Sequence, residues 1–519
     1  MSFPILSTVL WLPALGALLL LLLPRGADEL ARRVSLGVAV VTFLISLGLL
    51  SGYMPTITSG ATLAPELQFV EQIPWLPSWG VSYSIALDGI SLWLVLLTTF
   101  LHPVVVLSTW DSVHKEVRNF QILLQLLTTA MIGVFVAQDL LLFYIFWEFT
   151  LIPMTFLIGI WGGANRIYAA RKFFLSTFAG SVLMLLAIIG LYVLHRNAVV
   201  ASEPGFVGST EIGRIVSDLR AGRFTLDTTT ERLLFGAFFL AFAIKVPLWP
   251  FHTWLPDAHV EAPTAGSVVL AGVLLKLGSY GMIRFCLNFF PAASLWAAPA
   301  IAALAVIGIV YGAIVAFAQT DMKKLVAYSS VSHMGFIVLG IFALNREGVT
   351  GALLQMINHG LSTGALFLVV GVLYERRHTR ELAEYGGLWK IMPVYAALTL
   401  LIALSSAGLP GLNGFIGEFT IMQGAFLAPD LGWPFLGFAV LGVVLAAVYL
   451  LKMYRATFMG ELAEVNQGLP DLSRRELTTL VILCVPIILI GLYPALLFGP
   501  MQVSVGEVID GLSLIVAGR

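Results

Sequence analysis

Repeated apolar runs of about twenty residues most strongly constrain what this chain of 519 residues can fold into. A run of about this length lets an α-helix cross the hydrocarbon core of a bilayer. We interpret fourteen segments in this way, with bounds at residues 4–23, 33–52, 87–108, 119–136, 139–160, 173–194, 232–250, 266–289, 295–318, 325–343, 351–373, 394–423, 433–453 and 478–499. The sequence therefore predicts an all-α integral membrane protein with about fourteen transmembrane helices in one membrane domain.

The balance of apolar and charged residues excludes several classes of protein. Hydrophobic residues make up 59% of the chain and charged residues only 11%, whereas soluble domains have about 25% charged residues. The formal net charge of −1 provides no basic field for nucleic acid. We therefore exclude a soluble enzyme, a disordered protein and a nucleic-acid-binding protein. The first apolar run is followed by a second and lacks a cleavage-like site, so we interpret it as a span and not as a signal peptide.

The chain also lacks the motifs of common redox cofactors and metals. Its two cysteines, Cys286 and Cys484, stand alone in apolar stretches. Neither belongs to a C-x-x-C motif, so we expect no iron–sulfur cluster or zinc site. No predicted strand is followed by G-x-G-x-x-G, so no dinucleotide site is expected either. The chain is therefore predicted to bind no metal or cofactor and to carry no electrons itself.

The positions of lysine and arginine predict the orientation of the chain. Eighteen of the 28 basic residues fall in or near connections after odd-numbered spans, and eight fall on the other side. Because cytoplasmic loops are enriched in these residues, the odd connections are predicted to be cytoplasmic. Both termini, and a long polar connection at about residues 195–231, are then expected on the outer, periplasmic-like side. The two remaining basic residues, Lys245 and Lys276, fall inside predicted spans.

Five ionisable residues lie at membrane depth in five different spans. They are Glu148, Lys245, Lys276, His333 and Glu418, in predicted spans five, seven, eight, ten and twelve. Each such residue costs about 2.5–3.5 kcal/mol on insertion scales, so it is usually paired, hydrated or functional. Fixed ion pairs that only hold the bundle together are the alternative interpretation. The presence of five such groups, mostly at one depth, favours a function for the set.

The chemistry of these five groups suits the movement of protons. Desolvation favours the neutral form of a lysine or a carboxyl group, whereas a nearby opposite charge favours the ionised form. A lysine–carboxylate contact that forms and breaks would therefore load and release a proton. Histidine already titrates near neutrality. Arginine stays protonated, and none occupies these central positions.

Two predicted spans contain residues that interrupt a helix. These residues are Pro247 and Pro250 in the seventh span and Gly408, Pro410 and Gly411 in the twelfth. Pro247 is expected to free the carbonyl of Ala243, beside Lys245. Irregular backbone at this depth is tolerated where it is buried in protein or lines a wet cavity. Paired interruptions suggest two inverted transporter-like repeats, at 119–289 and 295–453, and a packing kink is the alternative for each.

Polar side chains recur at helical spacing on three of the spans. They are Gln355, Asn358, His359 and Ser362 on the eleventh, Ser329 and Ser332 beside His333 on the tenth, and Tyr144 and Thr155 beside Glu148 on the fifth. Each group falls on one helical face. Hydrogen bonding between helices is the alternative interpretation for any one face. Together they predict a polar axis that holds water through the bundle.

A segment next to the membrane contains several residue types that can bind metals. These residues are His252, Asp257, His259 and Glu261. The H-E-x-x-H spacing of a helical zinc site is absent, so we do not expect metal binding. We interpret the segment as a structural or proton-uptake turn on the cytoplasmic side.

Three long motifs resemble one known family. They are Trp254-Leu-Pro-Asp-Ala-His-Val-Glu-Ala-Pro-Thr264, Leu274-Leu-Lys-Leu-Gly-Ser-Tyr-Gly281 and Gly408-Leu-Pro-Gly-Leu-Asn-Gly414, and the stretch from Phe317 to Gly335 extends the match. They resemble the M subunit family of respiratory complex I, the proton-translocating NADH:quinone oxidoreductase, which is related to mitochondrial NADH dehydrogenase subunit 4. The resemblance covers nearly the whole chain. Glu418 stands where the L and N subunits and antiporter relatives usually carry lysine.

The resemblance implies a proton channel in a membrane arm, coupled to electron transfer from NADH to quinone in other subunits. By this resemblance, Glu148 would pair with Lys245, and Lys276 would be the central proton relay. His333 would pass the proton onward, and Glu418 would lead to the outer exit. FMN, iron–sulfur clusters and quinone would belong to partner subunits. L-type and N-type antiporter-like subunits would be the neighbours in an energy-transducing membrane, such as a bacterial plasma membrane.

Three alternatives remain open from the sequence. The chain could be a subunit of a related cation/proton antiporter, which would work without a redox partner, although Glu418 speaks against this. It could belong to the photosynthetic relative of complex I that takes electrons from ferredoxin. It could also be a passive scaffold, in which the buried charges only hold neighbouring subunits together.

Overall fold

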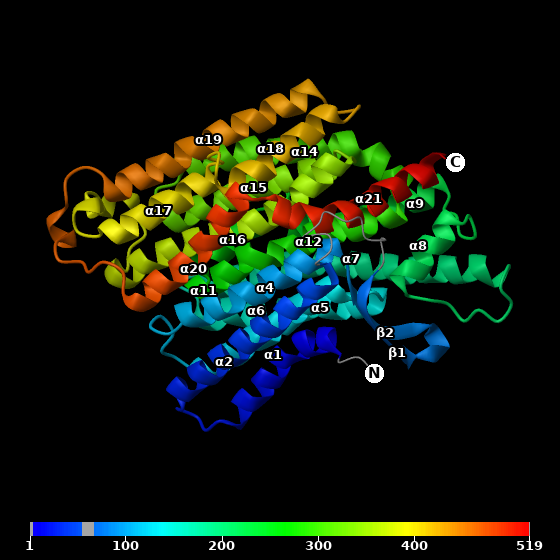
Figure 1. Ribbon diagram of the computed structural model, residues 1–519, viewed down its shortest axis with the longest axis horizontal. Coiled ribbons are helices and arrows are strands. Elements are labelled where there is room, and N and C mark those ends of the chain that lie inside the picture. The colour runs from blue at the N-terminus through cyan, green and yellow to red at the C-terminus, as the bar shows by residue number, and fades with distance from the viewer. Residues whose placement is uncertain (1–3, 54–66, 518–519) are drawn as a thin grey trace.

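The computed structural model describes residues 4–53 and 67–517. Within these ranges the chain is a bundle of helices that run side by side along its longest axis (Figure 1). Twelve helices of the described part are long and apolar enough to cross a membrane. They are α1 (Ile5–Leu22), α2 with a following 3-10 turn (Asp28–Tyr53), α4 (Gly89–Ser108), α5 (Val117–Val136), α6 (Leu140–Trp161), α7 (Arg166–Val200), the continuous helix Thr264–Phe289 that contains α11 to α13, α14 (Pro291–Ala318), α15 (Met322–Ile341), α16 (Arg346–Arg377), α19 (Trp433–Phe458) and α20 (Arg474–Leu492).

Two of the fourteen predicted spans do not occur as one continuous helix. In place of 232–250, α9 (Thr228–Lys245) ends at the lysine. The non-helical residues 246–253 follow, and the short helix α10 (Trp254–Glu261) begins after them. In place of 394–423, α17 (Pro393–Ser406) is followed by a turn and then by α18 (Asn413–Leu427). These are the two segments in which the sequence carries the interrupting prolines and glycines.

Aspartate side chains define where several helices begin. Asp88, Asp139, Asp227 and Asp321 precede α4, α6, α9 and α15, and each accepts hydrogen bonds from two backbone N–H groups of the first turn. These donors have no partner within the helix, so a carboxylate at this position satisfies them. Ser473 and Glu476 form a capping box at the start of α20.

The all-α prediction is wrong for the connection after the second span. Strands β1 (Gln68–Leu76) and β2 (Val81–Leu87) form an antiparallel hairpin whose turn contains Gly80 at φ 64°. The hairpin contacts the junction of α5 and α6, where the Gln138 N–H donates to the Ser84 carbonyl at 2.8 Å. A search for runs of about twenty apolar residues does not detect strands this short.

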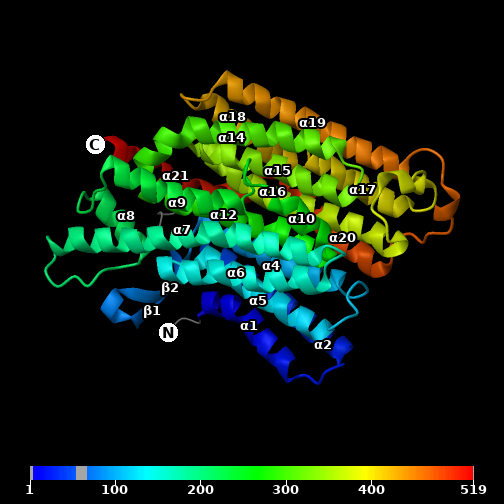
Figure 2. The same cartoon turned by 180° about the vertical axis from the view of Figure 1, so that it is seen from behind.

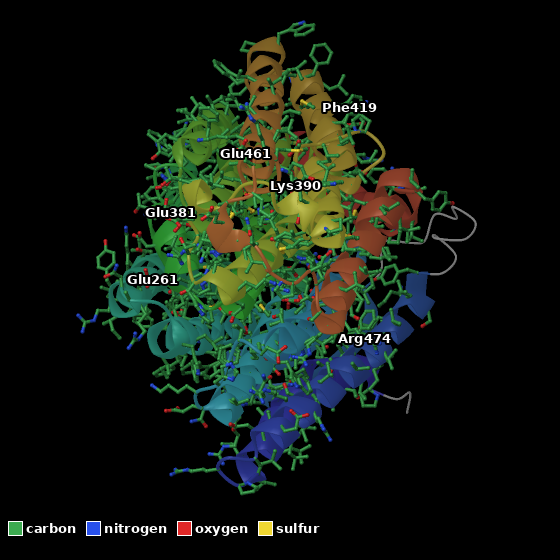
Figure 3. All side chains as sticks on the ribbon, turned by 90° about the vertical axis from the view of Figure 1, so that its left-hand side faces the viewer. Glu261, Glu381, Lys390, Phe419, Glu461 and Arg474 are labelled. Atoms are coloured by element: carbon green, nitrogen blue, oxygen red, sulfur yellow. The ribbon has the colours of Figure 1, made fainter. Side chains whose placement is uncertain are left out.

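The two ends of the bundle differ in composition. One end, called the basic end, carries the connections 24–27, 109–116, 378–392 and 459–473 and lies at the left of Figure 1. Figure 3 looks onto this end, where the labelled Lys390 and Arg474 lie. The opposite end, called the hairpin end, carries β1, β2 and the short helix α8 (Ile212–Arg220). Figure 2 shows that α7 runs along one face of the bundle and reaches α8 at the hairpin end.

A final helix, α21 (Ala495–Ala517), was not expected as a separate element, because the last predicted span continued to residue 499. It packs against the beginnings of α4 and α16 and against α8. Ser504 accepts a hydrogen bond from the Gly89 N–H at 2.9 Å, and Asp510 pairs with Arg346 at 2.7 Å. A turn at Tyr493 and Pro494 separates α21 from α20 because proline cannot supply the N–H that would continue the helix.

The centre of the bundle is formed by the helix Thr264–Phe289, α15 and α16. All residues in the apolar windows of the first and the last of these helices are buried, as are 89% of those of α15. By contrast, only 39% and 28% of the corresponding residues of α1 and α2 are buried. Lys276, His333 and His359 therefore belong to the most enclosed helices of the molecule.

Candidate functional site

Lys276 lies at the centre of the bundle with no exposed surface. It belongs to α12 (Leu275–Gly281), between two π-helical turns at Leu270–Leu274 and Met282–Cys286. Its ammonium donates to the carbonyl of Ala271, and Nζ lies 2.6 Å from Nδ1 of His359 on α16. A π-helical turn shifts the backbone hydrogen-bond pattern, and such turns are frequent at functional sites. Lys276 and His359 can therefore share a proton directly.

His333 on α15 and Glu418 on α18 form a second buried contact. Nδ1 of His333 lies 2.9 Å from Oε1 of Glu418, and the Gln355 amide donates to the same oxygen at 3.1 Å. The other carboxylate oxygen of Glu418, Oε2, has no hydrogen-bond partner among the described residues. It faces Gly408, where a Cβ atom would approach it to 3.1 Å. Gly408 has φ 75°, so a side chain here would cost both space and backbone strain.

The two contacts lie close enough to be joined by water. The ring centroids of His333 and His359 are 5.8 Å apart, and Nε2 of His359 has no partner among the described residues. A cavity of about 10 Å³ is lined by both histidines, and about this volume holds one water molecule. We call Lys276, His359, His333 and Glu418 the polar row. They form a nearly continuous line of proton-binding groups across the middle of the bundle.

The interruption between α17 and α18 is tied to the polar face of α16. Oδ1 of Asn413 accepts hydrogen bonds from Ser405 at 2.5 Å and from Ser362 at 3.3 Å. The Asn358 amide donates to the carbonyl of Asn413 at 2.7 Å. Irregular backbone inside a membrane protein needs such internal partners. The predicted stripe on the eleventh span thus supports the interruption and lines the polar row at the same time.

Lys245 occupies a different environment, at the C-terminal residue of α9. It is 1% exposed, and its ammonium donates only to Thr150, at 3.3 Å. It also lies 5.4 Å from the ring centroid of Trp147 and 5.7 Å from that of Phe173. Cation–π contacts of this kind partly replace lost hydration. No carboxylate among the described residues lies within 4.0 Å of Lys245.

Glu148 lies on α6, close enough to Lys245 for an electrostatic interaction but not in an ion pair. Its side chain is half-buried, and Oε1 has no hydrogen-bond partner among the described residues. Tyr144, one turn earlier on α6, interacts with the Glu148 carboxylate and with Ser181. The structure therefore shows Glu148 and Lys245 as separated neighbours.

The connection after Lys245 is more ordered than the sequence predicted. The carbonyl of Ala243 is not free, because it accepts a hydrogen bond from the Leu248 N–H at 2.9 Å. The carbonyl of Ile244 accepts from the Trp254 indole at 2.8 Å. The predicted turn at 252–261 is also partly wrong, since only His252 precedes α10, whereas Asp257, His259 and Glu261 lie on it. Pro256 fits this helix because a proline in the first turn loses no intrahelical hydrogen bond.

The residues on α10 face different surroundings. His259 is buried and stacks on Phe367 at 4.4 Å between centroids, and neither of its nitrogens has a partner among the described residues. Asp257 pairs with Lys172 at 2.6 Å. Glu261 accepts a hydrogen bond from the Asn165 N–H at 2.8 Å. The fourth residue, His252, lies 5.1 Å from the ring of Tyr311.

A cavity of about 170 Å³ opens beside α10 at the basic end. Its wall includes Glu261, Lys323 and Arg380, together with Phe367, on which His259 stacks. Lys323 and Arg380 donate to the carbonyls of Ala262 and Val260 at the end of α10. The cavity therefore brings polar groups of the basic end close to His259.

Several residues have roles that sequence reasoning did not assign. His359 was expected as a lining residue, but it is the direct partner of Lys276. Other residues that contact the site show no distinctive spacing in the sequence. Thr150 contacts Lys245, Tyr449 contacts His333, and Ser405 contacts Asn413. Conversely, the hydroxyls of Ser329, Ser332 and Thr155 donate to backbone carbonyls. Hydroxyl groups in membrane helices often bond in this way, so helical spacing alone does not identify a channel face.

The described residues contain no group of three or more His, Cys, Asp or Glu side chains placed to hold a metal ion. Cys286 and Cys484 are both free and buried. The lysine, histidine and carboxylate groups of the described site can bind and release protons.

Comparison with known proteins identifies the family. The model of the family "NADH:quinone oxidoreductase/Mrp antiporter, TM" matches residues 137–446. NADH-quinone oxidoreductase subunit M of Rhodobacter capsulatus is 46% identical over 98% of this chain and 96% of the relative. The subunit M proteins of Rickettsia felis and Mycobacterium tuberculosis are each 40% identical, over 97% and 94% of this chain and 98% and 91% of theirs.

Solved structures agree with this assignment. A chain of respiratory complex I from Thermus thermophilus, solved with bound NADH, is 32% identical and covers 98% of this chain and 99% of its own, with a TM-score of 0.85. A chain of the Mrp complex from Dietzia is 20% identical, covers 100% and 99%, and has a TM-score of 0.81, which shows a shared fold. The chain is therefore a multi-pass membrane protein that belongs to the family of NADH-quinone oxidoreductase subunit M, within the wider NADH:quinone oxidoreductase/Mrp antiporter family.

Proposed function

We propose that the chain is the M-type proton-translocating subunit in the membrane arm of NADH:quinone oxidoreductase. The observation that carries this proposal is the polar row, in which Lys276, His359, His333 and Glu418 are buried and lie in contact or one water apart. FMN, iron–sulfur clusters and quinone would be held by partner subunits, with L-type and N-type antiporter-like subunits as neighbours. The 46% identity to subunit M of Rhodobacter capsulatus supports this assignment.

The proposed path begins at the basic end, which is the cytoplasmic side by the excess of lysine and arginine there. A proton would enter the cavity beside α10, pass His259 and reach Lys276. From there it would cross the polar row to Glu418 on α18 and leave at the hairpin end, on the outer side. Both chain termini would then lie on the outer side of a bacterial plasma membrane.

The two interrupted helices support the proposal of two related halves. The twelve continuous helices plus the α9–α10 and α17–α18 segments amount to the fourteen crossings proposed from the sequence. We place the halves at 119–289 and 295–453, each with one interrupted helix that carries a charged residue of the site, Lys245 or Glu418. Interrupted helices at corresponding places are typical of inverted-repeat transporters.

Lys245 and Glu148 would form the part of the site that switches. Lys245 is buried with a single neutral hydrogen-bond partner, so its charge is poorly compensated when Glu148 is not in contact. Movement of the Glu148 carboxylate toward Lys245 would stabilise the protonated lysine, and movement away would favour release of the proton. Redox chemistry in partner subunits would drive this movement.

The variant Lys276→Ala in the assembled complex tests the proposal. We expect proton pumping coupled to NADH oxidation to fall by at least about tenfold, because the alanine removes a proton carrier that no neighbour replaces. Lys390→Ala, which changes an exposed lysine at the basic end, is the matched control (Figure 3) and should pump normally. Full proton pumping by assembled Lys276→Ala complex would contradict the proposed path.

A cation/proton antiporter subunit is the second candidate, and the fold shared with the Mrp complex favours considering it. Such a subunit would exchange cations for protons without a redox partner. Sodium-driven acidification by liposomes that contain this chain without partner subunits would support the antiporter. Proton movement only in the complex, and only during NADH oxidation, would support the pump.

A further inference from the structure

A buried ion pair lies outside the proposed proton path. Nη2 of Arg284 donates to Oδ2 of Asp88 at 2.6 Å and to the Ser91 hydroxyl at 3.2 Å. Nε of Arg284 donates to the Tyr280 hydroxyl at 3.2 Å, and that hydroxyl donates to the carbonyl of Phe135 at 2.9 Å. Arg284 and Asp88 are each only 8% exposed. The pair therefore connects the helix that carries Lys276 to the beginning of α4.

The groups of this pair are poor proton carriers. Oδ1 of Asp88 already accepts from the N–H groups of Ile90 and Ser91, and Oδ2 accepts from Arg284. Protonation of Asp88 would break these bonds and leave the guanidinium buried without its counter-charge, which is strongly unfavourable. Arg284 cannot release a proton at any physiological pH. Neither Asp88 nor Arg284 is therefore suited to take up a proton and pass it on.

The pair lies on the hairpin-end side of Lys276. Arg284 follows Lys276 by eight positions in the helix Thr264–Phe289, which corresponds to about 12 Å along the helix axis. This helix ends beside α8, at the hairpin end. In the proposed orientation, Arg284 therefore lies between Lys276 and the outer side.

Aromatic rings pack around Phe285, the residue that follows Arg284 in the helix. We call Phe143, Trp147, Phe238, Phe242 and Phe285 the aromatic cluster; neighbouring centroids within it lie 4.5–6.1 Å apart. Each of these residues is at most 4% exposed. Trp147 borders Lys245, and Phe285 is the residue after Arg284. Such a cluster offers no donor or acceptor for a chain of water molecules, apart from the indole of Trp147.

We propose that the Arg284–Asp88 pair and the aromatic cluster form a proton barrier that closes the first half of the chain toward the hairpin end. The barrier keeps a proton on Lys276 from passing straight to the outer side, so the polar row becomes its only outlet. An arginine in a membrane pore can exclude protons. The inference rests on the proposed function, because it names the residues that close the proposed proton path toward the outer side. In this proposal Arg284 acts through its contact with Asp88 and does not carry the transported proton.

The double variant Arg284→Gln with Asp88→Asn tests the barrier in membrane vesicles that contain the assembled complex. Two amides can keep a hydrogen bond between the two helices but remove both fixed charges. We expect NADH oxidation to continue, the protons pumped per NADH to fall by at least about twofold, and the passive proton permeability of the vesicles to rise. Arg346→Gln, which breaks the exposed pair with Asp510 at the same end, is the control and should change neither value.

A third substitution distinguishes a leak through Lys276 from a general defect of the complex. Addition of Lys276→Ala to the double variant should restore low proton permeability, because the leak begins at Lys276. A double variant with normal pumping and tight vesicles would overturn the barrier, and so would a leak that persists after Lys276→Ala. Normal pumping by Lys276→Ala alone would instead overturn the proposed function, so the two failures are distinguishable.

The variant Arg284→Lys covers the case in which the double variant does not assemble. Lysine keeps the charge opposite Asp88 but, unlike arginine, can release its proton. We expect a complex with normal content and NADH oxidation but with fewer protons pumped per NADH. Full coupling and tight vesicles with Arg284→Lys would contradict the barrier, because packing and charge alone would then account for the pair.

Discussion

The surroundings of Lys245 and of Glu418 differ sharply, although both residues lie next to an interrupted helix. Lys245 has one hydroxyl partner and two aromatic rings as neighbours. Glu418 is hydrogen-bonded to His333 and Gln355, and these two partners line a cavity that can hold one water molecule. The first region offers few partners for a charge, whereas the second is a connected polar network.

In the proposed function, this difference would let one chain hold both a proton switch and a proton-conducting path. A charge with few partners is costly in a buried site, so a small movement of a counter-charge changes its protonation. A charge inside a hydrogen-bonded network is better stabilised, and the network can pass protons along its hydrogen bonds. The proposed function would therefore place control in the region of Lys245 and conduction in the region of Glu418.

The largest loss of proton pumping is expected from a change of Lys245, which has few polar partners. We expect Lys245→Arg to reduce coupled proton pumping as severely as Lys245→Ala, by at least about tenfold, because arginine keeps the charge but cannot release the proton. Proton uptake by vesicles during NADH oxidation measures the effect, with Lys390→Arg as the control. Normal pumping by Lys245→Arg would mean that only the charge matters and would remove the switch.

The second effect tests the conducting region. Glu418→Gln keeps the shape and a hydrogen bond to His333 but removes a group that can bind and release a proton. We expect pumping to fall by about tenfold, less than for Lys245, because water in the adjacent cavity retains part of the path. The exposed Glu461→Gln, at the basic end (Figure 3), is the control. A larger effect at Glu418 than at Lys245 would reverse the comparison.

A smaller loss is expected when the network is weakened without the removal of a proton carrier. Asn413→Ala removes an acceptor shared by Ser405 and Ser362. The two hydroxyls also contact each other at 2.6 Å, so one donor loses its acceptor, at a cost of about 1–3 kcal/mol. The thermal stability of the purified complex should fall, and pumping should fall only a few-fold. The exposed Asn119→Ala is the control. Unchanged stability would show that water replaces the amide.

A still smaller effect on the complex is expected from a substitution in the turn between α17 and α18. Gly408→Ala places a side chain at φ 75° and 3.1 Å from Glu418, and the left-handed conformation alone costs about 1–2 kcal/mol. We expect lower thermal stability of the complex. Gly437→Ala in α19, with no neighbour within 4 Å, is the control and should be neutral or slightly stabilising. Equal behaviour of the two variants would argue against a close approach at Gly408.

The smallest effect on pumping is expected at Asp218 of α8, outside both regions. Burial raises the pKa of this carboxyl, but hydrogen bonds from Arg214, His195 and Arg223 outweigh burial and hold the pKa below its ordinary value. The stabilisation is thus complete above the unfolded value of about 3.9 and is lost as the pH falls through the folded value. Hydrogen exchange of α8, corrected for its intrinsic pH dependence, should show weaker protection in acid.

A substitution provides the matched test for Asp218. Asp218→Asn should weaken the protection of α8 at neutral pH, whereas the exposed Asp430→Asn should not. Pumping should stay near normal in both variants. Equal protection of α8 in Asp218→Asn and the parent protein would show that the carboxylate contributes nothing to this region.

Much of the arrangement follows from local sequence features. The apolar runs indicate the twelve continuous helices because a helix in lipid must satisfy its own backbone groups. The prolines and glycines near Lys245 and Glu418 occur at the two interruptions because they prevent or permit particular backbone angles. The hairpin β1–β2 and the helix α21 were missed because a strand signal is weak and the end of an apolar run does not define a turn.

The sequence by itself indicated Lys245, Lys276, His333 and Glu418 as buried ionisable groups, since each lies within an apolar run. Only the tertiary structure decided which of them touch. Lys276 meets His359 and His333 meets Glu418 across 83 and 85 positions of the chain, whereas Glu148 and Lys245 stay apart. The reason is physical: helical spacing defines the face on which a side chain lies, but the packing of one helix against another sets the distance between faces.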